Sequence, residues 1–237
     1  MNKVKSALTK SSTQAPRTRL INHFLSSSNT KSYLEIGVRY GENFFQVNAS
    51  KKIGVDPAYF FSKRSLIKSF LHKRNWFFKM YKMESDSFFS LYKKLFKRIP
   101  LDVVFIDGMH TYEQSLEDAK NCLRHLELNG TIILHDCNPQ SEEAGSPKLP
   151  RKPINWNGDV WKTICQLRTL NEYFDCFTID ADQGLGVLKA KVKITDNILN
   201  LLSPLDNITA LTYKDLVANR TEYIGLTKLS ELKIKNI

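Results

Sequence analysis

The stretch LDVVFIDGMHTYEQ, residues 101–114, joins an apolar run to a polar loop and then to the start of a helix. Its first part, Leu101–Asp107, is short and mostly apolar and ends on a carboxylate, which is the pattern of a buried strand. Residues 112–128 then place Leu116 and Leu123 on one side of a helix. A buried strand followed by an amphipathic helix is typical of α/β folds, in which helices cover a parallel sheet.

The same alternation continues outward on both sides of this stretch. Short apolar runs predict further strands at 32–37, 51–56, 76–83 and 131–136. Helical spacing predicts helices at 19–25, 59–74, 85–96, 112–128 and 159–170. Asn129-Gly130 is interpreted as the glycine cap that ends helix 112–128. Runs at 173–179 and 185–190 predict a terminal antiparallel pair. Together they predict a doubly wound, mostly parallel seven-stranded sheet with helices on both faces, a Rossmann-like α/β fold.

A chain of 237 residues is long enough for one such domain with tails. We expect a basic, flexible N-terminus at 1–18, with an organelle transit peptide as an open alternative. The main domain is expected at 19–190. It includes an irregular insertion at 137–158, a length of loop that is more often functional than idle. The last segment, 191–237, is expected to be a helical tail that serves as a lid, a dimer arm or a loosely held end.

Positive charge is concentrated in one part of the chain. The formal net charge is +11, and residues 51–98 alone hold thirteen Lys and Arg against three acidic residues. Such a segment attracts nucleic acid, an anionic membrane or a phosphorylated substrate, or it is a solvated lysine-rich surface. Within it, the helix expected at 59–74 would have Leu66, Phe70 and Leu71 on its apolar side.

Cysteine usage and hydropathy limit the class of protein. The four cysteines form no C-x-x-C pair, so neither a zinc site nor a redox dithiol is expected. Scattered thiols are typical of a reducing compartment, which predicts a cytoplasmic protein. No apolar run approaches the ~18 residues of a membrane span.

The stretch EIGVRYGEN, residues 35–43, predicts a ligand-binding turn. Gly37 and Gly41 bracket a turn from a strand into a helix, where a glycine lets a ligand approach the backbone. The next strand ends on Asp56, and a carboxylate at that place accepts hydrogen bonds from ribose hydroxyls. Arg39 stands where the dinucleotide-binding fingerprint has its central glycine, which counts against an NAD-dependent enzyme. A plain strand-to-helix turn is the alternative.

Two later strands end on acidic residues that have histidines nearby. Asp107 ends the strand of residues 101–107, with His110 in the following loop, and Asp136 ends the next strand beside His135. If these strands are neighbours, their ends lie roughly 5 Å apart. Carboxylates and imidazoles this close suit Mg²⁺ or another divalent cation, with histidine widening the choice to Mn²⁺ or Fe²⁺.

In order and spacing, EIGVRYG, GVD, FIDGMHTYE and LNGTIILHD resemble the class I S-adenosylmethionine-dependent methyltransferases. The chain is most similar to the branch that includes the metal-dependent sugar O-methyltransferases and the cephalosporin hydroxylase-like proteins. The resemblance covers residues 33–190. It implies a transferase that uses S-adenosylmethionine, and O-methylation of a sugar or glycan hydroxyl with assistance from a divalent cation.

The resemblance also implies roles for individual residues. Glu35, Gly37 and Gly41 would hold the methionine end of the cofactor, Asp56 its ribose, and Asp86 and Ser87 would lie near the adenine. Asp107 would face both the cofactor and the reaction. Asp107 and Asp136 would bind the metal, with His135 as third ligand in a place where the sugar methyltransferases often have another acid. His110 would be the general base.

Other interpretations of these residues stay open. Asp107 and Asp136 could cap the segments that follow them, His110 could be a loop histidine bound to backbone, and His135 could orient Asp136. Trp156, Asp159 and Trp161 could form an aromatic wall for a sugar or cap the next helix.

The function also has alternatives. One is a nucleic-acid methyltransferase that uses the basic segment. It is not favoured, because no NPPY-like or DPPY-like motif follows the fourth strand. Another is a non-catalytic binding module on the same scaffold, because a fold does not fix a function. The expected partner is a small-molecule or saccharide acceptor. A homo-oligomer is an open alternative.

Overall fold

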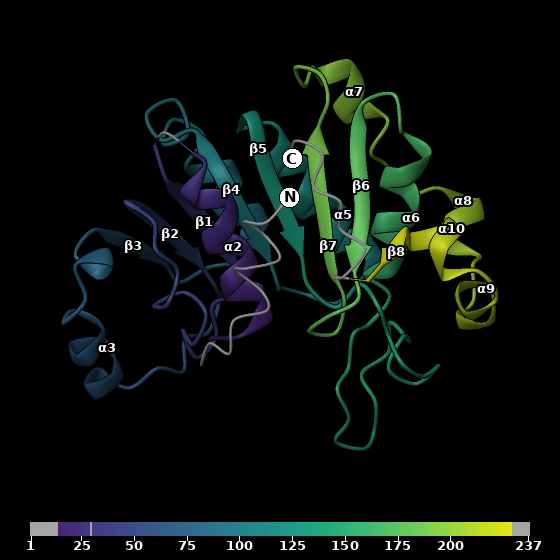
Figure 1. Ribbon diagram of the computed structural model, residues 1–237, viewed down its shortest axis with the longest axis horizontal. Coiled ribbons are helices and arrows are strands. Elements are labelled where there is room, and N and C mark those ends of the chain that lie inside the picture. The colour runs from purple at the N-terminus through teal and green to yellow at the C-terminus, as the bar shows by residue number, and fades with distance from the viewer. Residues whose placement is uncertain (1–13, 29, 229–237) are drawn as a thin grey trace.

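The computed structural model describes residues 14–28 and 30–228 and shows one eight-stranded sheet with helices on both faces (Figure 1). The strand order is β3-β2-β1-β4-β5-β7-β6-β8. The strands are β1 (Ser32–Ile36), β2 (Lys51–Val55), β3 (Phe78–Tyr81), β4 (Leu101–Ile106), β5 (Leu126–Leu134), β6 (Phe174–Ile179), β7 (Leu185–Ala190) and β8 (Leu226–Thr227). The doubly wound α/β prediction is confirmed.

The predicted count of seven strands is wrong by one. Thr178 and Ile179 of β6 pair in parallel with Leu226 and Thr227, which form β8 at the edge of the sheet. β6 and β7 are antiparallel as predicted, but they are not terminal, because β8 follows them in the chain. A strand of two residues has no apolar run long enough to be recognised from sequence.

The parallel register brings the ends of four strands to one edge of the sheet. Ile36 at the end of β1 pairs with Val55 of β2 and Ile106 of β4, and Ile106 pairs with Leu134 of β5. The residues that directly follow these strand ends therefore lie side by side. Ligands of open α/β sheets bind at this edge.

Two apolar cores hold the helices against the sheet. Alternate residues of β4 point to opposite faces, so Val104 and Ile106 join one cluster while Val103 and Phe105 join the other. The first cluster includes residues of α4 (Ser85–Leu91), α5 (Tyr112–Leu123) and α6 (Trp161–Thr169). The second includes residues of α2 (Pro16–Ser26), and Figure 1 shows α2 and α5 on opposite faces. α2 thus begins within the segment predicted to be flexible, while residues 1–13 lie outside the described residues.

The predicted glycine cap at Asn129-Gly130 is wrong. α5 ends at Leu123 and β5 begins three residues later, so both residues lie inside β5. Asn129 has φ 74°, a left-handed conformation that asparagine adopts more readily than most residues. The ladder is irregular here, because Leu101 pairs with Leu126 whereas Val103 pairs with Thr131. The Asn-Gly pair forms a bulge within a strand rather than the end of a helix.

The helices predicted at 59–74 and 85–96 are shorter than expected. The first is α3 (Lys63–Ser69), followed by the 3₁₀ helix η1 (Lys73–Asn75), and the second is α4, which ends at Leu91. β3 is one of the two edge strands of the sheet, so α3 beside it has little apolar surface to cover. The predicted apolar side is confirmed in part: Leu66 packs against the second core and Phe70 against Phe78, whereas Leu71 lies after the end of α3 and is exposed.

The segment after β7 adds further short helices to the first core. They are α7 (Asp196–Asn200), α8 (Asp206–Thr209), α9 (Tyr213–Ala218) and α10 (Arg220–Ile224). Leu199, Leu216 and Ile224 are buried in the same cluster as the α6 side chains. The insertion at 137–158 forms neither helix nor strand. Among the described helices, none is long and apolar enough to cross a membrane.

Candidate active site

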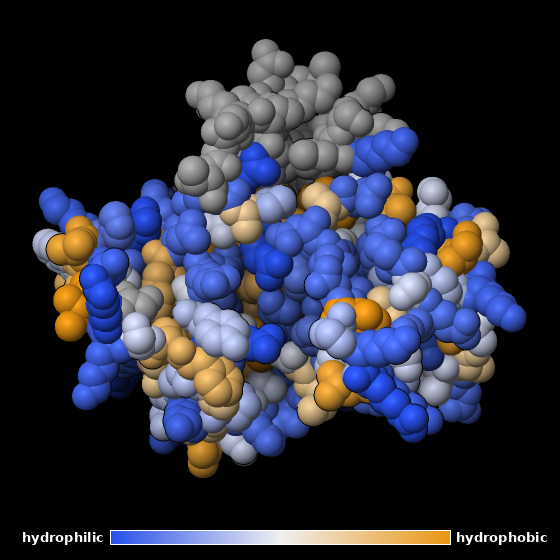
Figure 2. Space-filling model, turned by 90° about the horizontal axis from the view of Figure 1, so that it is seen from below, coloured by the Kyte–Doolittle hydropathy of each residue, from blue (hydrophilic) through white to orange (hydrophobic). Residues whose placement is uncertain are grey.

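A pocket of about 480 Å³ opens at the edge where the parallel strands end, the side of the molecule seen in Figure 2. Five of the predicted site residues line it, and they come from three loops and the first turn of α4. These residues are Gly37, Asp56, Asp86, Asp107 and His110. The topology therefore brings together residues that are up to 73 positions apart in the sequence.

Gly37 forms the turn directly after β1. Its φ is 85°, and a Cβ at this position would lie 1.9 Å from the carbonyl oxygen of Asp107. No residue with a side chain fits there, because the conflicting atom belongs to the backbone. Gly41 also has a positive φ, 73°, but it packs against the ring of Phe45 and does not line the pocket.

The carboxylate of Asp56 is held in place by two backbone amides. Its Oδ2 accepts a hydrogen bond from Arg39 N at 2.7 Å, and its Oδ1 accepts one from Ala58 N at 2.7 Å. Each carboxylate oxygen has a second lone pair, which remains available to a hydroxyl donor in the pocket. The turn that Arg39 forms, at φ 46°, is therefore built around Asp56.

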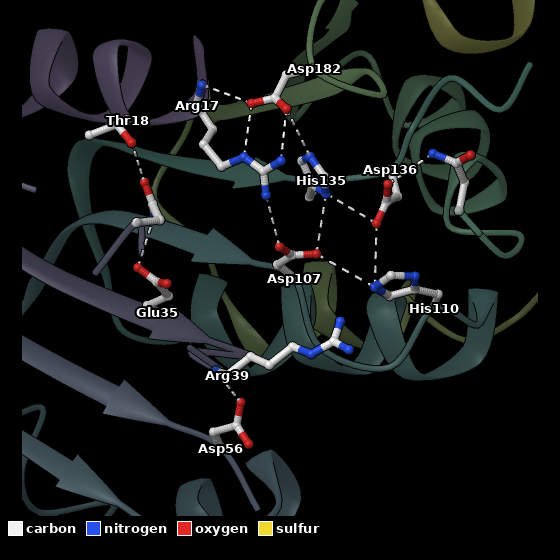
Figure 3. A network of polar contacts seen from close by, with 12 residues as sticks. Arg17, Thr18, Glu35, Arg39, Asp56, Asp107, His110, His135, Asp136 and Asp182 are labelled. Carbon is white, nitrogen blue, oxygen red and sulfur yellow. Dashed lines mark hydrogen bonds and ion pairs between the residues drawn. The ribbon is translucent and has the colours of Figure 1, made fainter. Parts of the chain in front are cut away.

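Glu35 lies beneath the pocket rather than in its wall. It is buried, and its Oε2 accepts hydrogen bonds from Tyr33 Oη and, at 2.9 Å, from Asn43 Nδ2. Thr18 Oγ1 donates to Asn43 Oδ1 at 2.7 Å, so α2 is tied to β1 through this chain of polar groups (Figure 3). Burial raises the pKa of Glu35 to about 8, against the opposing effect of these hydrogen bonds.

The segment predicted to lie near an adenine is only partly at the pocket. Asp86 lines it, together with Glu84 and Ser85, whereas Ser87 is exposed outside it. Gln114 of α5 donates to Asp86 Oδ1 at 3.3 Å and to Asp118 Oδ1 at 3.2 Å. These contacts link the start of α4 to α5 at this side of the pocket.

Asp107 lies among two histidines and an arginine. Its Oδ1 lies 3.5 Å from His110 Nε2 and 3.2 Å from His135 Nδ1, and its Oδ2 lies 3.3 Å from Arg17 Nη1 (Figure 3). Burial alone would raise the pKa of Asp107, but the charges of His135 and His110 outweigh it and hold that pKa well below its usual range.

Asp136 faces the same two histidines. Its Oδ2 lies 3.3 Å from His110 Nε2 and 3.1 Å from His135 Nδ1, and its Oδ1 accepts a hydrogen bond from Asn157 Nδ2 at 2.8 Å. The backbone φ of Asp136 is 63°, a left-handed conformation that is strained for residues other than glycine. Neighbouring β4 and β5 therefore bring both carboxylates together, as the sequence predicted.

His110 is oriented by the insertion. Its Nδ1 donates to the carbonyl oxygen of Trp156 at 2.9 Å, and the two rings lie 5.2 Å apart. Because a carbonyl only accepts, the proton is on Nδ1 and the lone pair of neutral His110 is on Nε2, which faces the carboxylates. Burial lowers the pKa of His110, but its contact with Asp107 and the charge of Asp136 raise it more, so the net pKa is above the ordinary value.

Of the three residues predicted as a sugar wall or a helix cap, only Trp156 lies beside the cluster. Asp159 Oδ1 accepts a hydrogen bond from Tyr112 N at 2.8 Å, so it binds the start of α5 rather than capping the helix that follows it. Trp161 is buried in the core.

Two residues of the cluster were not predicted from the sequence. Arg17 reaches in from α2, and Asp182 comes from the turn between β6 and β7. Asp182 Oδ1 also lies 3.7 Å from His135 Nε2. A single arginine near the start of the sequence and a single aspartate in a turn belong to no motif, so only the fold could identify them.

The donor set fits a divalent cation. Ligand atoms of Asp107, His110 and Asp136 all lie within 4.8 Å of one another. Within residues 14–28 and 30–228, the ring nitrogens of buried His135 have no partner with hydrogen-bond geometry, although they lie 3.1–3.7 Å from carboxylate oxygens. Two carboxylates and an imidazole suit Mg²⁺ or Mn²⁺. His110 therefore joins the carboxylates as a candidate ligand, and His135 as third ligand stays a prediction.

Part of the chain matches a known protein family. Residues 34–137 match a family model described as a methyltransferase domain. This range runs from β1 to just past Asp136, so it contains the pocket and both carboxylates of the cluster.

Solved structures share the fold at low sequence identity. The O-methyltransferase TomG from Streptomyces achromogenes, solved in complex with SAM, aligns with a TM-score of 0.56 at 12% identity, covering 81% of this chain and 91% of TomG. Cofactor-bound Rv0187 from MTB aligns with a TM-score of 0.55 at 13% identity, covering 79% and 86%. An O-methyltransferase from Bacillus cereus in complex with SAH aligns with a TM-score of 0.50 at 13% identity, covering 80% and 88%. The predicted resemblance to class I methyltransferases is confirmed.

Proposed function

We propose that this chain is a class I methyltransferase that transfers the methyl group of S-adenosylmethionine to a hydroxyl oxygen of a small-molecule acceptor, with a sugar or glycan as the acceptor class. The observation that carries the proposal is the position of His110. Its Nε2 faces two carboxylates at the rim of a pocket that Gly37 and Asp56 also line. A proton acceptor thus lies next to a cofactor-sized pocket.

The residues around the pocket would divide the cofactor between them. Asp56, fixed by two amides, would accept hydrogen bonds from the ribose hydroxyls. Gly37 would allow close approach of the methionine end, and Asp86 would lie toward the adenine. Glu35 and Gly41 would act indirectly, because they shape the turn from outside the pocket.

When bound, S-adenosylmethionine supplies an electrophilic methyl group on a sulfonium. The protein must align an acceptor oxygen with that methyl group and remove the hydroxyl proton. His110 Nε2 accepts this proton, and the carboxylates of Asp107 and Asp136 stabilise the imidazolium that forms. The carbonyl of Trp156 keeps the other ring nitrogen protonated throughout.

A divalent cation would change the role of His110. Asp107, Asp136 and His110 would hold the ion, which would supply Lewis-acid stabilisation of the acceptor oxygen. The lone pair of Nε2 can either accept a proton or bind a metal ion. His110 would therefore be a base in the metal-free protein and a ligand in the metal-loaded one. Dependence of turnover on added metal distinguishes the two.

The proposed acceptor class is supported by the polar rim. A saccharide presents hydroxyl groups and an apolar ring face. Here Trp156 offers an aromatic ring beside His110, while two carboxylates offer hydrogen-bond acceptors. The insertion that carries Trp156 would then take part in choosing the acceptor.

Calorimetric titration with S-adenosylmethionine tests the cofactor. We expect micromolar binding, which corresponds to about −8 kcal/mol. The Asp56→Ala variant should lose it, and Asp175→Ala, which changes a carboxylate on exposed β6 surface, should keep it. Absence of binding by the unmodified chain, with and without Mg²⁺, contradicts the proposal.

Methyl transfer to candidate acceptors tests the chemistry. Incubation with labelled S-adenosylmethionine and a panel of saccharides, phenols and RNA should label a saccharide hydroxyl. Label that enters RNA instead would assign the chain to nucleic-acid methylation. Cofactor binding without turnover on any acceptor would favour the non-catalytic binding module.

A further inference from the structure

One exposed surface combines apolar side chains with positive charge. We call residues 63–79, which include α3, η1 and the first two residues of β3, the α3 patch. Four of its large apolar side chains are mostly exposed: Ile67 at 69%, Leu71 at 81%, Trp76 at 55% and Phe77 at 74%. Figure 2 shows orange side chains beside blue ones at the left edge of the molecule, the side where Figure 1 places α3.

The charged residues of the chain segment that carries the α3 patch are all basic. Between Pro57 and Met83 the sequence has seven Lys and Arg and no Asp or Glu. Lys63, Lys68 and Lys73 are exposed, so their ammonium groups are available to a partner. Exposed apolar side chains flanked by basic residues, with no acidic residues among them, complement a partner that has an apolar interior and an anionic surface.

The inner side of the α3 patch is well anchored. The ring of Phe70 stacks on that of Phe78 at 5.6 Å, and Trp76 Nε1 donates to the carbonyl oxygen of Phe70 at 3.0 Å. Buried Asn75 accepts a hydrogen bond from Lys52 Nζ at 2.6 Å and donates to the carbonyl oxygen of Phe45 at 3.1 Å. The outward apolar side chains are therefore presented by a fixed segment.

We propose that the α3 patch docks the protein on an anionic lipid bilayer. Ile67, Leu71, Trp76 and Phe77 enter the boundary between headgroups and acyl chains, and the lysines contact lipid phosphates. Tryptophan and phenylalanine favour this boundary, and long lysine side chains reach from an apolar face to charged headgroups. The binding is peripheral and uses no membrane-spanning element.

Lipid accounts for this surface better than nucleic acid does. Single-stranded nucleic acid is bound by aromatic side chains that stack on bases and by cations that contact phosphates. Exposed Ile67 and Leu71 offer no stacking face, whereas burial of aliphatic side chains in a bilayer is favourable in proportion to their area. The aliphatic half of the α3 patch therefore favours lipid over nucleic acid as the partner.

Docking through the α3 patch would also position the pocket. Phe60 lines the pocket, is exposed, and contacts the ring of Tyr40 at 5.7 Å. It precedes α3 by only three residues. A bilayer on the α3 patch thus lies beside the pocket mouth. This proposal does not depend on the identity of the methyl acceptor.

Vesicle co-sedimentation of the full chain tests the proposal without any activity assay. We expect binding to vesicles of phosphatidylcholine with phosphatidylserine, little binding to phosphatidylcholine alone, and weaker binding as salt rises. Lys68→Glu combined with Lys73→Glu should lower partitioning at least about tenfold, because each cation near such a surface contributes roughly fivefold. The matched control Lys93→Glu with Lys97→Glu makes the same charge change outside the α3 patch.

A second pair of variants tests the apolar contacts. Leu71→Ser with Phe77→Ser should lose vesicle binding, while Leu128→Ser with Leu149→Ser, two exposed leucines elsewhere, should keep it. Trp76 is the exposed one of the three tryptophans, so its fluorescence should shift to the blue on vesicles and the shift should vanish in Trp76→Phe. Circular dichroism confirms that each variant is folded.

Two results would overturn the proposal. One is that the unmodified chain does not bind phosphatidylserine vesicles at low salt. The other is that both α3 patch variants bind them as well as the unmodified chain does. Binding to an RNA homopolymer that is lost in Lys68→Glu with Lys73→Glu, together with no vesicle binding, would assign the α3 patch to nucleic acid instead.

Discussion

The guanidinium of Arg17 binds both carboxylate oxygens of Asp182, at 2.8 Å from Nε and 2.7 Å from Nη2, across 165 positions of sequence. The backbone N–H of Arg17 also donates to Asp182 Oδ2 at 3.1 Å. Its remaining amino group lies 3.3 Å from Asp107 Oδ2. The first turn of α2 is therefore fastened to the cluster of carboxylates and histidines at the edge of the sheet.

Replacing Arg17 should loosen this attachment. In Arg17→Ala, Asp182 keeps its backbone bond but loses its charged partner, and we expect the free energy of unfolding to fall by about 1–2 kcal/mol, since both side chains are partly exposed. Turnover should fall as well, because Asp107 loses a neighbouring cation. Urea denaturation measures the stability.

The control is Arg151→Ala, which removes an exposed arginine from the insertion. A double-mutant cycle with Asp182→Asn isolates the pair. Additive effects of the two substitutions would show that the contact between Arg17 and Asp182 does not stabilise the fold.

Glu35 predicts a specific dependence of stability on pH. Its pKa is about 8 in the folded protein and 4.5 ordinarily, so between these values the folded protein holds a proton that the unfolded chain has lost. Stability from this group is therefore greatest below pH 4.5 and is lost as the pH rises through 8. The slope approaches about 1.4 kcal/mol per pH unit.

Comparison of variants isolates this contribution. Glu35→Gln should be less sensitive to pH between 5 and 8 than the unmodified chain, because glutamine does not titrate. Glu42→Gln, which changes an exposed acid on the same turn, should leave the slope as it is. Equal slopes for Glu35→Gln and the unmodified chain would place the pKa of Glu35 near its ordinary value.

The parts of the site that follow strand ends could be predicted from the sequence. An apolar run shows where β4 ends, so Asp107 was placed correctly, and the same holds for Asp56 after β2 and Asp136 near the end of β5. Parallel strands end at one edge, which is why these residues converge. His110 followed because it lies only three residues after Asp107.

The remaining parts depend on contacts that no local pattern encodes. Arg17 and Asp182 meet only because α2 covers the sheet near the β6–β7 turn. Asn129-Gly130 has the composition of a helix cap, but its place in the sheet ladder makes it a bulge. Leu71 has helical spacing in the sequence, but α3 ends at Ser69 and Leu71 is exposed. Helical spacing alone shows neither where a helix ends nor whether a neighbouring element covers its apolar face.

Gly37 and Gly108 provide a matched pair of glycines at the pocket. Gly37→Ala should destabilise the fold by at least about 2 kcal/mol, because its φ of 85° disfavours a side chain and the new Cβ would overlap the Asp107 carbonyl. It should also abolish cofactor binding, because the turn after β1 must move. Chemical denaturation and calorimetry measure the two effects.

Gly108→Ala should be milder. Its nearest contact would be the side chain of Ile36 at 3.2 Å, which can shift by a few tenths of an ångström. The test is whether Gly37→Ala lowers the free energy of unfolding more than Gly108→Ala does. A Gly37→Ala protein as stable as Gly108→Ala would mean that the close approach between β1 and Asp107 is not required.

His110 is the residue on which the proposed chemistry depends. His110→Ala should lower kcat by about a hundredfold to ten-thousandfold, the range for loss of a general base. The binding of S-adenosylmethionine should change little, because Asp56 and Gly37 hold the cofactor. His72→Ala, which removes an exposed histidine after α3, is the control. Full turnover by His110→Ala would remove the residue from the mechanism.

Two further measurements decide which role His110 has. Imidazole added to His110→Ala should restore part of the turnover if Nε2 accepts the proton, because a free base can enter the space that the side chain left. If His110 is a ligand instead, a chelator should stop the unmodified enzyme and Mg²⁺ or Mn²⁺ should restore it, with weaker metal affinity in His110→Ala. Because Asp107 and Asp136 lie within reach of the same nitrogen, turnover that resists chelation would assign both carboxylates to stabilising the protonated histidine.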